Sequence, residues 1–481
     1  MGSTRLEKFK KTFIGDRAFY TAVVTLMLPI VIQNAITHFI NLLDNIMIGQ
    51  VGNSEMSGVS IANQLLFVFN LAVFGGLSGA GVFCAQFFGA KDHDNLRYTL
   101  RFKLWTIAII FAVAITIFLT CGDRLIMLYL TGEGEEAERT AMFMFAKQYL
   151  AIMLWGLLPF CVSQAYGSTL RETGETVLPM RAGIVGILTN LCLNYLLIYG
   201  KLGFPRLGVE GAAIATVISR FVEMAIITIY AHKHSARFPF FKGLYKSFKI
   251  PKALTLRIFK KGSPLLLNEL FWSFGITTIT QIFSTRGLMV VGALNITSTV
   301  TNFFNVFMYS MGAAVAVMIG QALGANEIER AKETVWKLIF LNICICGAVS
   351  CVLAATSPFI PYLYKTTDQV RELASSFMRT HALYMIFNAI SNSSYFTMRS
   401  GGKMLLTVLF DSVYTWVIFV PFTYVLTRFT ALGITALYTV CYLTDILKAA
   451  NGLIVVKSGV WAQNMVSKQN VVVETPQMQA E

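Results

Sequence analysis

The chain contains two copies of one sequence pattern. Residues 29–131 align with residues 264–366 without a gap, at a constant offset of 235 positions. Apolar runs align with apolar runs, and charged loops align with charged loops. Transporters are commonly built from such repeats, with their ligand sites inside the bilayer. The identities that fix the register include Pro29 with Pro264, Phe39 with Phe274, Gly52 with Gly287, Phe69-Asn70 with Phe304-Asn305, Gln86 with Gln321, Gly89-Ala90 with Gly324-Ala325, and Leu128-Tyr129 with Leu363-Tyr364.

Composition indicates that most of the chain lies in lipid. Hydrophobic residues make up 55% of it and charged residues 13%, and the mean hydropathy is +0.62. Apolar stretches of about 20 residues, long enough to cross a hydrocarbon core of ~30 Å, recur along the sequence. Helices satisfy their backbone groups within lipid, and the alternating pattern of a membrane barrel is absent. We predict an all-α integral membrane protein of about twelve transmembrane helices in two six-helix lobes related by the repeat, with spans at 20–48, 57–88, 100–120, 143–168, 178–199, 209–231, 263–284, 293–323, 335–356, 376–398, 404–426 and 433–455.

The positions of Lys and Arg predict the orientation, because basic residues gather in short cytoplasmic loops. Residues 231–263, which join the two repeats, carry nine Lys or Arg and no Asp or Glu. We expect the protein to lie in the plasma membrane. We expect this loop and both termini to face the cytoplasm. The formal charge of +14 is interpreted as this signal and as attraction to anionic membrane lipids. The expected parts are a cytoplasmic N-terminal segment (1–19), an N-lobe (20–231), a basic linker (232–262), a C-lobe (263–456) and a cytoplasmic tail (457–481).

Several function classes lack their sequence signatures. The apolar run that begins at Tyr20 is too long for the core of a signal peptide. The eight cysteines have neither C-x-x-C nor zinc spacing, and the histidines form no metal cluster. Without a G-x-x-x-x-G-K-[ST] loop, ATP does not drive this chain directly, so an ion gradient or a partner must. No nucleophile–base pair indicates an enzyme, no basic face indicates nucleic acid, and neither a cofactor nor an obligatory protein partner is expected.

Polar residues at membrane depth are candidates for function, because they are costly there. In the first span Asn34, His38, Asn41 and Asn45 recur at i, i+4, i+7 and i+11, and they form one stripe on a helix. Interhelical hydrogen bonding is one reading of this stripe. The other is the wall of a substrate cavity, for which the candidates are Asn34, His38, Asn41 and, in the second span, Gln64.

Asp44 is a predicted functional residue, because a carboxylate within a span must be paired, protonated or bound to a cation. Asn190 and Asn194 lie four residues apart on one face of the fifth span, and Thr216 adds a hydroxyl from the sixth. These oxygens would suit Na⁺, the one metal ion expected here. A single carboxylate can also be protonated, which favours H⁺. Pro29 lacks an N–H and is the predicted bend of the first helix.

The second repeat carries a different set of polar groups. Glu269 is the acid of the seventh span, Asn388 lies in the tenth and Asp411 in the eleventh. Asp44 aligns with Ile279, so the two lobes are not chemically equivalent. We interpret Glu269, Asn388 and Asp411 as a candidate C-lobe site for coupling or for substrate.

The chain resembles the multidrug and toxic compound extrusion (MATE) family of secondary transporters over about residues 20–460. The motifs that carry this resemblance are Leu28-Pro29 with Asp44-Asn45-Ile46-Met47-Ile48-Gly49, then Gln86-Phe87-Phe88-Gly89-Ala90, Leu170-Arg171-Glu172-Thr173-Gly174, Asn190-Leu191-Cys192-Leu193-Asn194, and Gly208-Val209-Glu210-Gly211-Ala212-Ala213-Ile214-Ala215-Thr216. The resemblance implies two six-helix lobes around a central cavity, and export of cationic or amphipathic small molecules in exchange for H⁺ or Na⁺. It also implies that Asp44 is the coupling carboxylate, with Asn190, Asn194 and Thr216 beside it.

Two positions depart from the family pattern. One branch of the family has an Asp where this chain has Asn194, and another has a coupling Asp where this chain has Asn388.

Two alternatives stay open at this stage. A lipid-linked saccharide flippase would share the architecture, although such proteins more often carry extra spans and cationic cavity residues. A membrane sensor or scaffold that transports nothing would need a soluble domain or a long tail.

Overall fold

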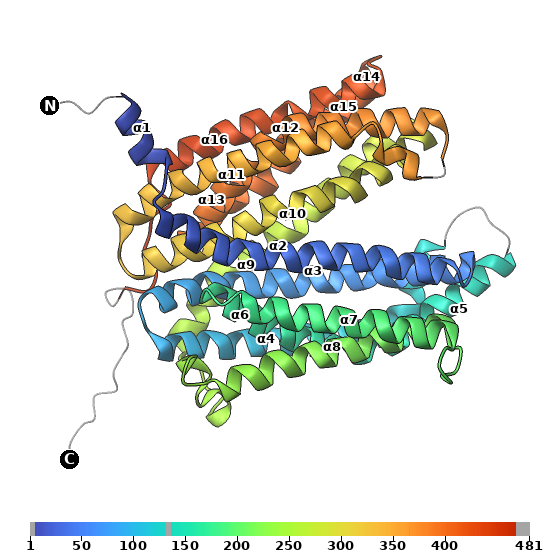
Figure 1. The fold of residues 1–481 in the computed structure, drawn as a ribbon, viewed down its shortest axis with the longest axis horizontal. Coiled ribbons are helices and arrows are strands. Elements are labelled where there is room, and N and C mark those ends of the chain that lie inside the picture. Colours follow the sequence, from blue (N-terminus) through green and yellow to red (C-terminus); the bar gives the residue numbers. More distant parts are fainter. Residues whose placement is uncertain (1–4, 131–135, 365, 468–481) are drawn as a thin grey trace. The chain divides into compact units, whose positions relative to one another are not determined.

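The structure is a computed structural model that describes residues 5–130, 136–364 and 366–467, and within these ranges the regular secondary structure is entirely helical (Figure 1). Helices cover all twelve predicted spans, which confirms the all-α membrane prediction. The first half contains α1 (Arg5–Phe13), α2 (Arg17–Gly49), α3 (Asn53–Gly89), α4 (His93–Tyr129), α5 (Glu136–Met153), η1 (Leu154–Gly156), α6 (Leu157–Glu172), α7 (Val177–Tyr199), α8 (Gly208–Lys233), η2 (Pro239–Phe241) and η3 (Leu244–Lys246). The second half contains α9 (Lys252–Ser284), α10 (Leu288–Gly324), α11 (Ile328–Thr356), η4 (Ile360–Leu363), α12 (Asp368–Ser400), α13 (Met404–Val408), η5 (Leu409–Val413), η6 (Thr415–Phe419), α14 (Val420–Phe429), α15 (Ile434–Tyr442) and α16 (Thr444–Ser458).

Length and hydropathy alone recognise ten candidate membrane spans within the described residues. The other two predicted spans, 263–284 and 376–398, lie in α9 and α12, which are 33 residues long each. Both helices carry many polar side chains, including Glu269 in α9. The two predicted spans that hydropathy does not recognise are therefore the ones that bring polar groups into the interior of the second half.

The chain divides into two compact units. The N-terminal unit comprises Leu28–Gly81 and Arg97–Ile250, and the C-terminal unit comprises Met1–Met27, Val82–Leu96 and Pro251–Glu481. One boundary between the units passes through α2 directly before Leu28, next to Pro29. Because proline removes a backbone donor from the helix interior, this boundary falls where the hydrogen-bond ladder of α2 is weakened.

Each unit has its own apolar core. In the N-terminal unit, α3, α5, α6, α7 and α8 contribute buried side chains that include Val59, Leu66, Leu157 and Ile198. In the C-terminal unit, α10, α11, α12 and α16 surround Met311, Leu338, Met398 and Val456. Many large apolar side chains stay exposed, as expected for helices whose outer faces contact lipid.

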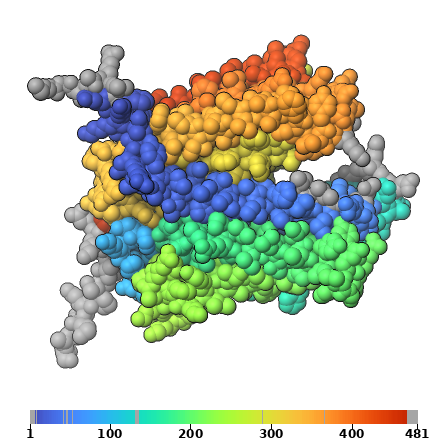
Figure 2. Space-filling view, viewed as in Figure 1, coloured from blue at the N-terminus to red at the C-terminus, as the bar shows by residue number. Residues whose placement is uncertain are grey.

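The short helix α1 packs within the C-terminal unit against α11. Phe9 and Phe13 of α1 each lie 5.7 Å, ring centroid to ring centroid, from Phe340 of α11. Figure 2 shows the dark blue N-terminal part of the chain against the orange part of the second half. The basic N-terminal segment is thus anchored by aromatic side chains.

The first part of the basic linker folds onto the N-terminal unit. Arg101 of α4 is buried, and its guanidinium donates to the carbonyls of Gly243, Leu244 and Lys249 at 2.9–3.3 Å. Three carbonyl acceptors match the planar set of donors that arginine presents. This contact fixes residues 243–249 as an ordered element rather than a loose tether.

The segment after α16 is held inside the C-terminal unit by Gln86, at the end of α3. The Gln86 amide nitrogen donates to the carbonyls of Ser400 (2.9 Å) and Gln463 (3.3 Å), and its oxygen accepts from the Met465 backbone N–H at 2.8 Å. The Trp461 side chain is fully buried in the same segment. Residues 461–465 are therefore part of the packed unit.

Candidate functional site

Asp44 lies in a cluster of neutral polar side chains within the N-terminal unit. The Asn194 amide nitrogen donates to Asp44 Oδ1 at 2.7 Å and to Asn190 Oδ1 at 3.1 Å. Asn190 and Asn194 are both buried on α7, and Thr216 approaches from α8. The structure therefore brings together the four residues predicted as the coupling cluster: Asp44, Asn190, Asn194 and Thr216.

The Asn190 amide can complete this cluster in two orientations. In one, its nitrogen donates to Thr216 Oγ1 at 3.1 Å. With the amide oxygen and nitrogen exchanged, the nitrogen donates to Asp44 Oδ2 at 3.1 Å and the oxygen accepts from the Thr216 hydroxyl. An ionised carboxylate only accepts hydrogen bonds, whereas a protonated one also donates. Asn190 can thus match either charge state of Asp44.

One acceptor in the cluster has no described donor. Asn194 Oδ1 is buried and lacks a hydrogen-bond partner among the residues that the structure describes. A buried acceptor of this kind is costly unless a donor or a cation reaches it. It lies on the amide that already touches Asp44, so this oxygen is free to accept a hydrogen bond or to coordinate a cation.

Tyr149 extends the cluster, and sequence reasoning missed it. This side chain of α5 is buried, and its hydroxyl has Thr216 and Asn63 as polar neighbours. It sits in an apolar run, where a tyrosine usually serves packing, so the sequence carried no signal for it. Its place can be read only from the packing of α5 against α8.

The predicted cavity residues are less enclosed than the Asp44 cluster. Asn34 is half-buried, and His38 and Gln64 are exposed. The side chain of Asn41 lies outside the described residues, as does that of Asn45. The structure thus leaves the prediction of a substrate wall at these positions untested.

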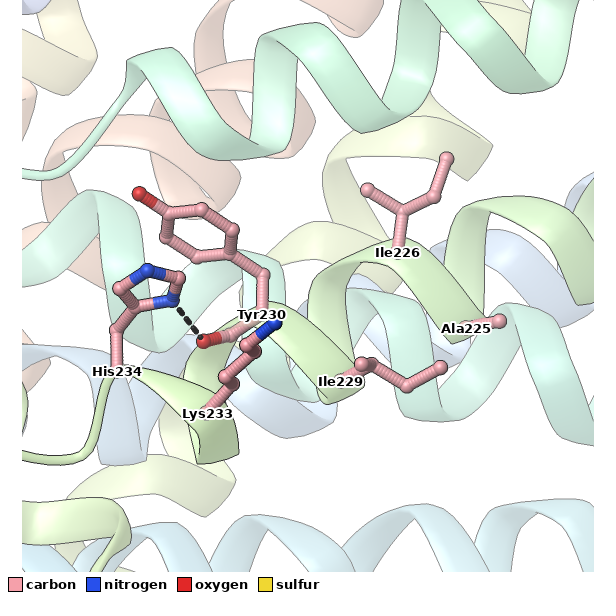
Figure 3. Close-up of a pocket in the computed structure, with 6 residues that line it drawn as sticks. All are labelled: Ala225, Ile226, Ile229, Tyr230, Lys233 and His234. Atoms are coloured by element: carbon pink, nitrogen blue, oxygen red, sulfur yellow. Dashed lines mark hydrogen bonds between the residues drawn. The ribbon is translucent and has the colours of Figure 1, made fainter.

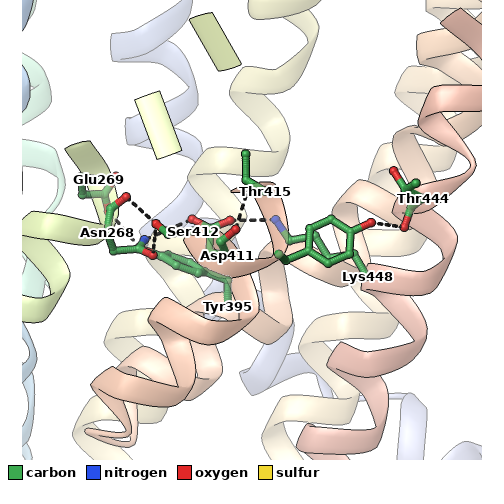
Figure 4. Close-up of polar contacts among 9 residues, drawn as sticks. Asn268, Glu269, Tyr395, Asp411, Ser412, Thr415, Thr444 and Lys448 are labelled. Atoms are coloured by element: carbon green, nitrogen blue, oxygen red, sulfur yellow. Dashed lines mark hydrogen bonds and ion pairs between the residues drawn. The ribbon is translucent and has the colours of Figure 1, made fainter. Parts of the chain in front are cut away.

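A second polar network lies in the C-terminal unit, between α9, α12, η5 and α16 (Figure 4). The Lys448 ammonium is 2.7 Å from Asp411 Oδ1, and the Asn268 amide donates to Asp411 Oδ2 at 3.1 Å. Tyr395 donates its hydroxyl proton to Glu269 Oε1 at 2.9 Å. Asp411 lies on the π-helix η5, a form that is often found at functional sites.

Further groups close this network. Arg399 of α12 lies 3.8 Å from Glu269 Oε1. Asp445 is buried one turn before Lys448 and has the Asn388 side chain as a polar neighbour. The three carboxylates of the network thus face two cations. The predicted residues Glu269, Asn388 and Asp411 do lie in this network, but Lys448, Arg399 and Tyr395 were not anticipated.

The two clusters differ in the charge of what touches each carboxylate. Asp411 contacts a lysine, Glu269 an arginine, and Glu223 of α8 has Arg171 and Arg220 as electrostatic neighbours. The described hydrogen bonds of Asp44 come from neutral amides. No group of three or more His, Cys, Asp or Glu is placed to hold a metal ion in the part of the chain that the structure describes.

A family model described as MatE matches residues 29–196 and, separately, residues 264–425. The chain belongs to the MatE family. Both matches begin at the paired prolines, Pro29 and Pro264, so they cover the two copies that the sequence repeat defines. The predicted membership of the MATE transporters is confirmed.

Multidrug resistance proteins of bacteria are similar to this MatE protein along most of their length. A probable multidrug resistance protein NorM of Thermotoga maritima is 24% identical over 444 residues, which cover 92% of this chain and 93% of the relative. The probable multidrug resistance protein YoeA of Bacillus subtilis is 27% identical over 414 residues, with 85% and 87% covered. The protein is thus a member of a family of multidrug efflux transporters.

Solved MATE structures share the fold. A crystal structure of a mutant of the Vibrio cholerae MATE transporter VcmN superimposes with a TM-score of 0.82 at 17% identity, covering 93% of this chain and 98% of that one. A crystal structure of MATE in the bent conformation gives a TM-score of 0.80 at 20% identity, covering 95% and 98%. At such identities the likeness concerns the fold alone.

Proposed function

We propose that this MatE protein is a secondary antiporter of the cell membrane that exports cationic or amphipathic small molecules in exchange for protons. The exchange uses alternating access between an N-lobe and a C-lobe, each of six helices. Asp44 carries the coupling proton, with Asn190, Asn194 and Thr216 around it. Asn34, His38, Asn41 and Gln64 belong to the substrate path, and the basic linker and both termini face the cytoplasm.

The observation that carries this proposal is the neutral surrounding of Asp44. A lysine or an arginine beside a carboxylate favours its ionised form, because the cation stabilises the negative charge. Asp411 and Glu269 are in that position. Asp44 receives hydrogen bonds from amides, whose stabilisation of the charge is weaker. Among these three carboxylates, Asp44 is therefore the one that can gain and lose a proton without breaking an ion pair.

Protonation of Asp44 changes the hydrogen bonds that the Asp44 cluster can form. Ionised Asp44 accepts from Asn194 and, after rotation of the Asn190 amide, from Asn190 as well. Protonated Asp44 gains a donor, and in its unrotated orientation the Asn190 amide places its oxygen 3.1 Å from Asp44 Oδ2, where it can accept that proton. Each charge state thus has its own hydrogen-bond pattern. A two-state cluster of this kind can bias a conformational equilibrium.

Pro29 supplies the place where that bias acts. The boundary between the two compact units crosses α2 next to this residue. Asp44 lies further along the same helix, in the part of α2 that belongs to the N-terminal unit. A change in the hydrogen bonds of Asp44 alters how the second part of α2 packs against α7. We propose that α2 bends at Pro29 during the cycle.

Transport in liposomes tests this function. The purified full-length protein is reconstituted, the vesicles are loaded with a fluorescent cationic dye, and a pH gradient or a Na⁺ gradient is imposed separately. We expect dye efflux with the pH gradient and its loss with a protonophore. Efflux that persists with the protonophore on an imposed Na⁺ gradient, and stops when K⁺ replaces Na⁺, would assign sodium instead. Absence of transport with both gradients would contradict antiport.

A further inference from the structure

A surface groove lies along the last turns of α8 in the N-terminal unit. Six residues line it, and they form two parallel rows of i, i+4 neighbours, shown in Figure 3: Ala225, Ile229 and Lys233 in one row, and Ile226, Tyr230 and His234 in the other. Both rows change from aliphatic to polar in the same direction. The groove is therefore apolar toward the middle of the helix and polar at its end.

The polar end of the groove is held in a defined arrangement. The Tyr230 and His234 rings stack with centroids 4.0 Å apart, and His234 Nδ1 lies 3.0 Å from the Tyr230 carbonyl oxygen. Because a carbonyl only accepts, Nδ1 carries the proton, and the ring then presents Nε2 for another partner. The Lys233 side chain is exposed beside it. A cation and an imidazole thus share one end of the groove.

The apolar end of the groove faces the bilayer. Residues Gly208–Lys233 form a candidate membrane span, of which only 22% of the apolar window is buried inside the protein. Ile229 in the groove is 65% exposed. Lipid tails are the natural neighbours of such a surface, whereas a soluble anion would use only the polar end. The last turn of the span then lies at the level of the lipid headgroups.

Charge around the polar end favours an anion. Residues 231–250 contain no Asp or Glu and five cations, of which Arg237 pairs with Glu175 at 2.6 Å; the other four are Lys233, Lys242, Lys246 and Lys249. The C-terminus of a helix by itself repels anions, so side-chain cations must supply the attraction. In the same unit, Trp105 of α4 and Phe248 of the linker are about half exposed with ring centroids 6.3 Å apart, as expected of an aromatic pair at a membrane interface.

We propose that the α8 groove binds one anionic phospholipid. An acyl chain lies along Ala225, Ile226 and Ile229, and the phosphate diester is held by the Lys233 ammonium, to which His234 adds an Nε2–H donor when its ring is protonated. The site is defined by the end of α8 and does not depend on the transported substrate or on the coupling ion.

Native mass spectrometry of the full-length protein in detergent tests this site. Phosphatidylglycerol and phosphatidylcholine with identical chains are added separately, and the bound fraction is measured. We expect preferential retention of phosphatidylglycerol. The change Lys233→Gln should weaken it about fivefold, the effect of one basic residue near a charged headgroup. Lys246→Gln, which removes an exposed lysine of the same linker outside the groove, is the matched control and should leave retention near that of the parent.

Two further arms separate a lipid from other ligands. Ile229→Gln keeps the charges and makes the apolar end polar, so it should also reduce retention. If Ile229→Gln changes nothing while glycerol phosphate displaces the lipid, the groove binds a soluble anion and the lipid assignment is wrong. Equal retention of both lipids, or equal losses in Lys233→Gln and Lys246→Gln, would also overturn it. A photoactivatable phosphatidylglycerol should crosslink to residues 225–234, independently of any substitution.

Discussion

Gly89 and Gly324, which are equivalent in the two repeats, each face the backbone of the other repeat's motif within the C-terminal unit. A Cβ atom on Gly89 would overlap the carbonyl group of Gln321, and a Cβ on Gly324 would overlap that of Gln86. The contact is reciprocal, as in a twofold interface. The two repeat motifs that share the letters Q-x-x-G-A thus cross where neither helix can carry a side chain.

We predict that Gly324→Ala destabilises the protein by about 1–3 kcal/mol, the typical result of overpacking a rigid site. In a helix interior, alanine is otherwise favoured over glycine by ~1 kcal/mol. A loss of stability in Gly324→Ala would therefore indicate the clash of the new Cβ atom. Gly89→Ala should act alike because the contact is reciprocal. Gly433→Ala is the control, since nothing lies within 4 Å of a Cβ there and φ is −59°. Thermal unfolding in detergent measures the difference, and a stabilised Gly324→Ala protein would contradict it.

The buried pair of Asp411 and Lys448 gives a second prediction. Their side chains are 14% and 15% exposed, so Lys448→Met leaves a carboxylate in a poorly solvated place. Loss of one partner of a buried pair typically costs about 3–5 kcal/mol. We expect a large fall in the unfolding temperature of Lys448→Met and partial recovery in Lys448→Met/Asp411→Asn, because the second change removes the unpaired charge. No recovery in the double variant would mean that Lys448 acts through packing rather than through Asp411.

The lengths of the apolar runs and the spacing of polar residues predicted the helices, the Asp44 cluster and some of the residues of the C-terminal network. Each apolar run became a helix, since lipid leaves the backbone few alternatives. The Asp44 cluster could be predicted because Asn190 and Asn194 share a helical face and belong to a motif. The sequence also indicated Asp411 as a polar residue in an apolar run.

The partners of these residues could not be predicted in the same way. Lys448 meets Asp411 across 37 positions because α16 packs beside η5, and that packing has no local signature. The sequence offered one sign that Lys448 lies in a polar environment: Asp445 stands three residues before it, on the same face of a helix. The π-helical turns of η5 and η6 also have no hydropathy signal. Tyr149 reaches Thr216 only through tertiary packing.

The orientation of the linker can be tested by labelling. Nine basic residues and no acidic ones between 231 and 263 predict a cytoplasmic position. In a background without the native cysteines, Lys246→Cys should resist a membrane-impermeant thiol reagent in intact cells and react after permeabilisation. Glu138→Cys, on the predicted outer side, should react in intact cells. The opposite pattern would invert the topology.

Asp44→Asn should abolish proton-coupled efflux while leaving folding and membrane insertion intact. An amide keeps the shape of the side chain and, like the protonated acid, offers both an acceptor and a donor, but it cannot exchange a proton. Asp123→Asn is the control, because that carboxylate is 54% exposed and pairs with Lys147. Dye efflux on an imposed pH gradient should be lost in Asp44→Asn and kept in Asp123→Asn. Efflux by well-folded Asp44→Asn protein at the parental rate would place the coupling elsewhere.

Asn194→Asp should shift the ion preference toward sodium. The Asn194 side chain lies 2.7 Å from Asp44 Oδ1, so the substitution sets two carboxylates side by side. Two like charges at this distance repel, and the site must then share a proton or bind a cation. Because the buried Asn194 amide oxygen becomes part of a carboxylate, the variant supplies the second negative charge that a bound Na⁺ needs. We expect dye efflux on a Na⁺ gradient with a protonophore present in Asn194→Asp, and none in the parent. If both proteins respond only to the pH gradient, the charge at residue 194 does not select the ion.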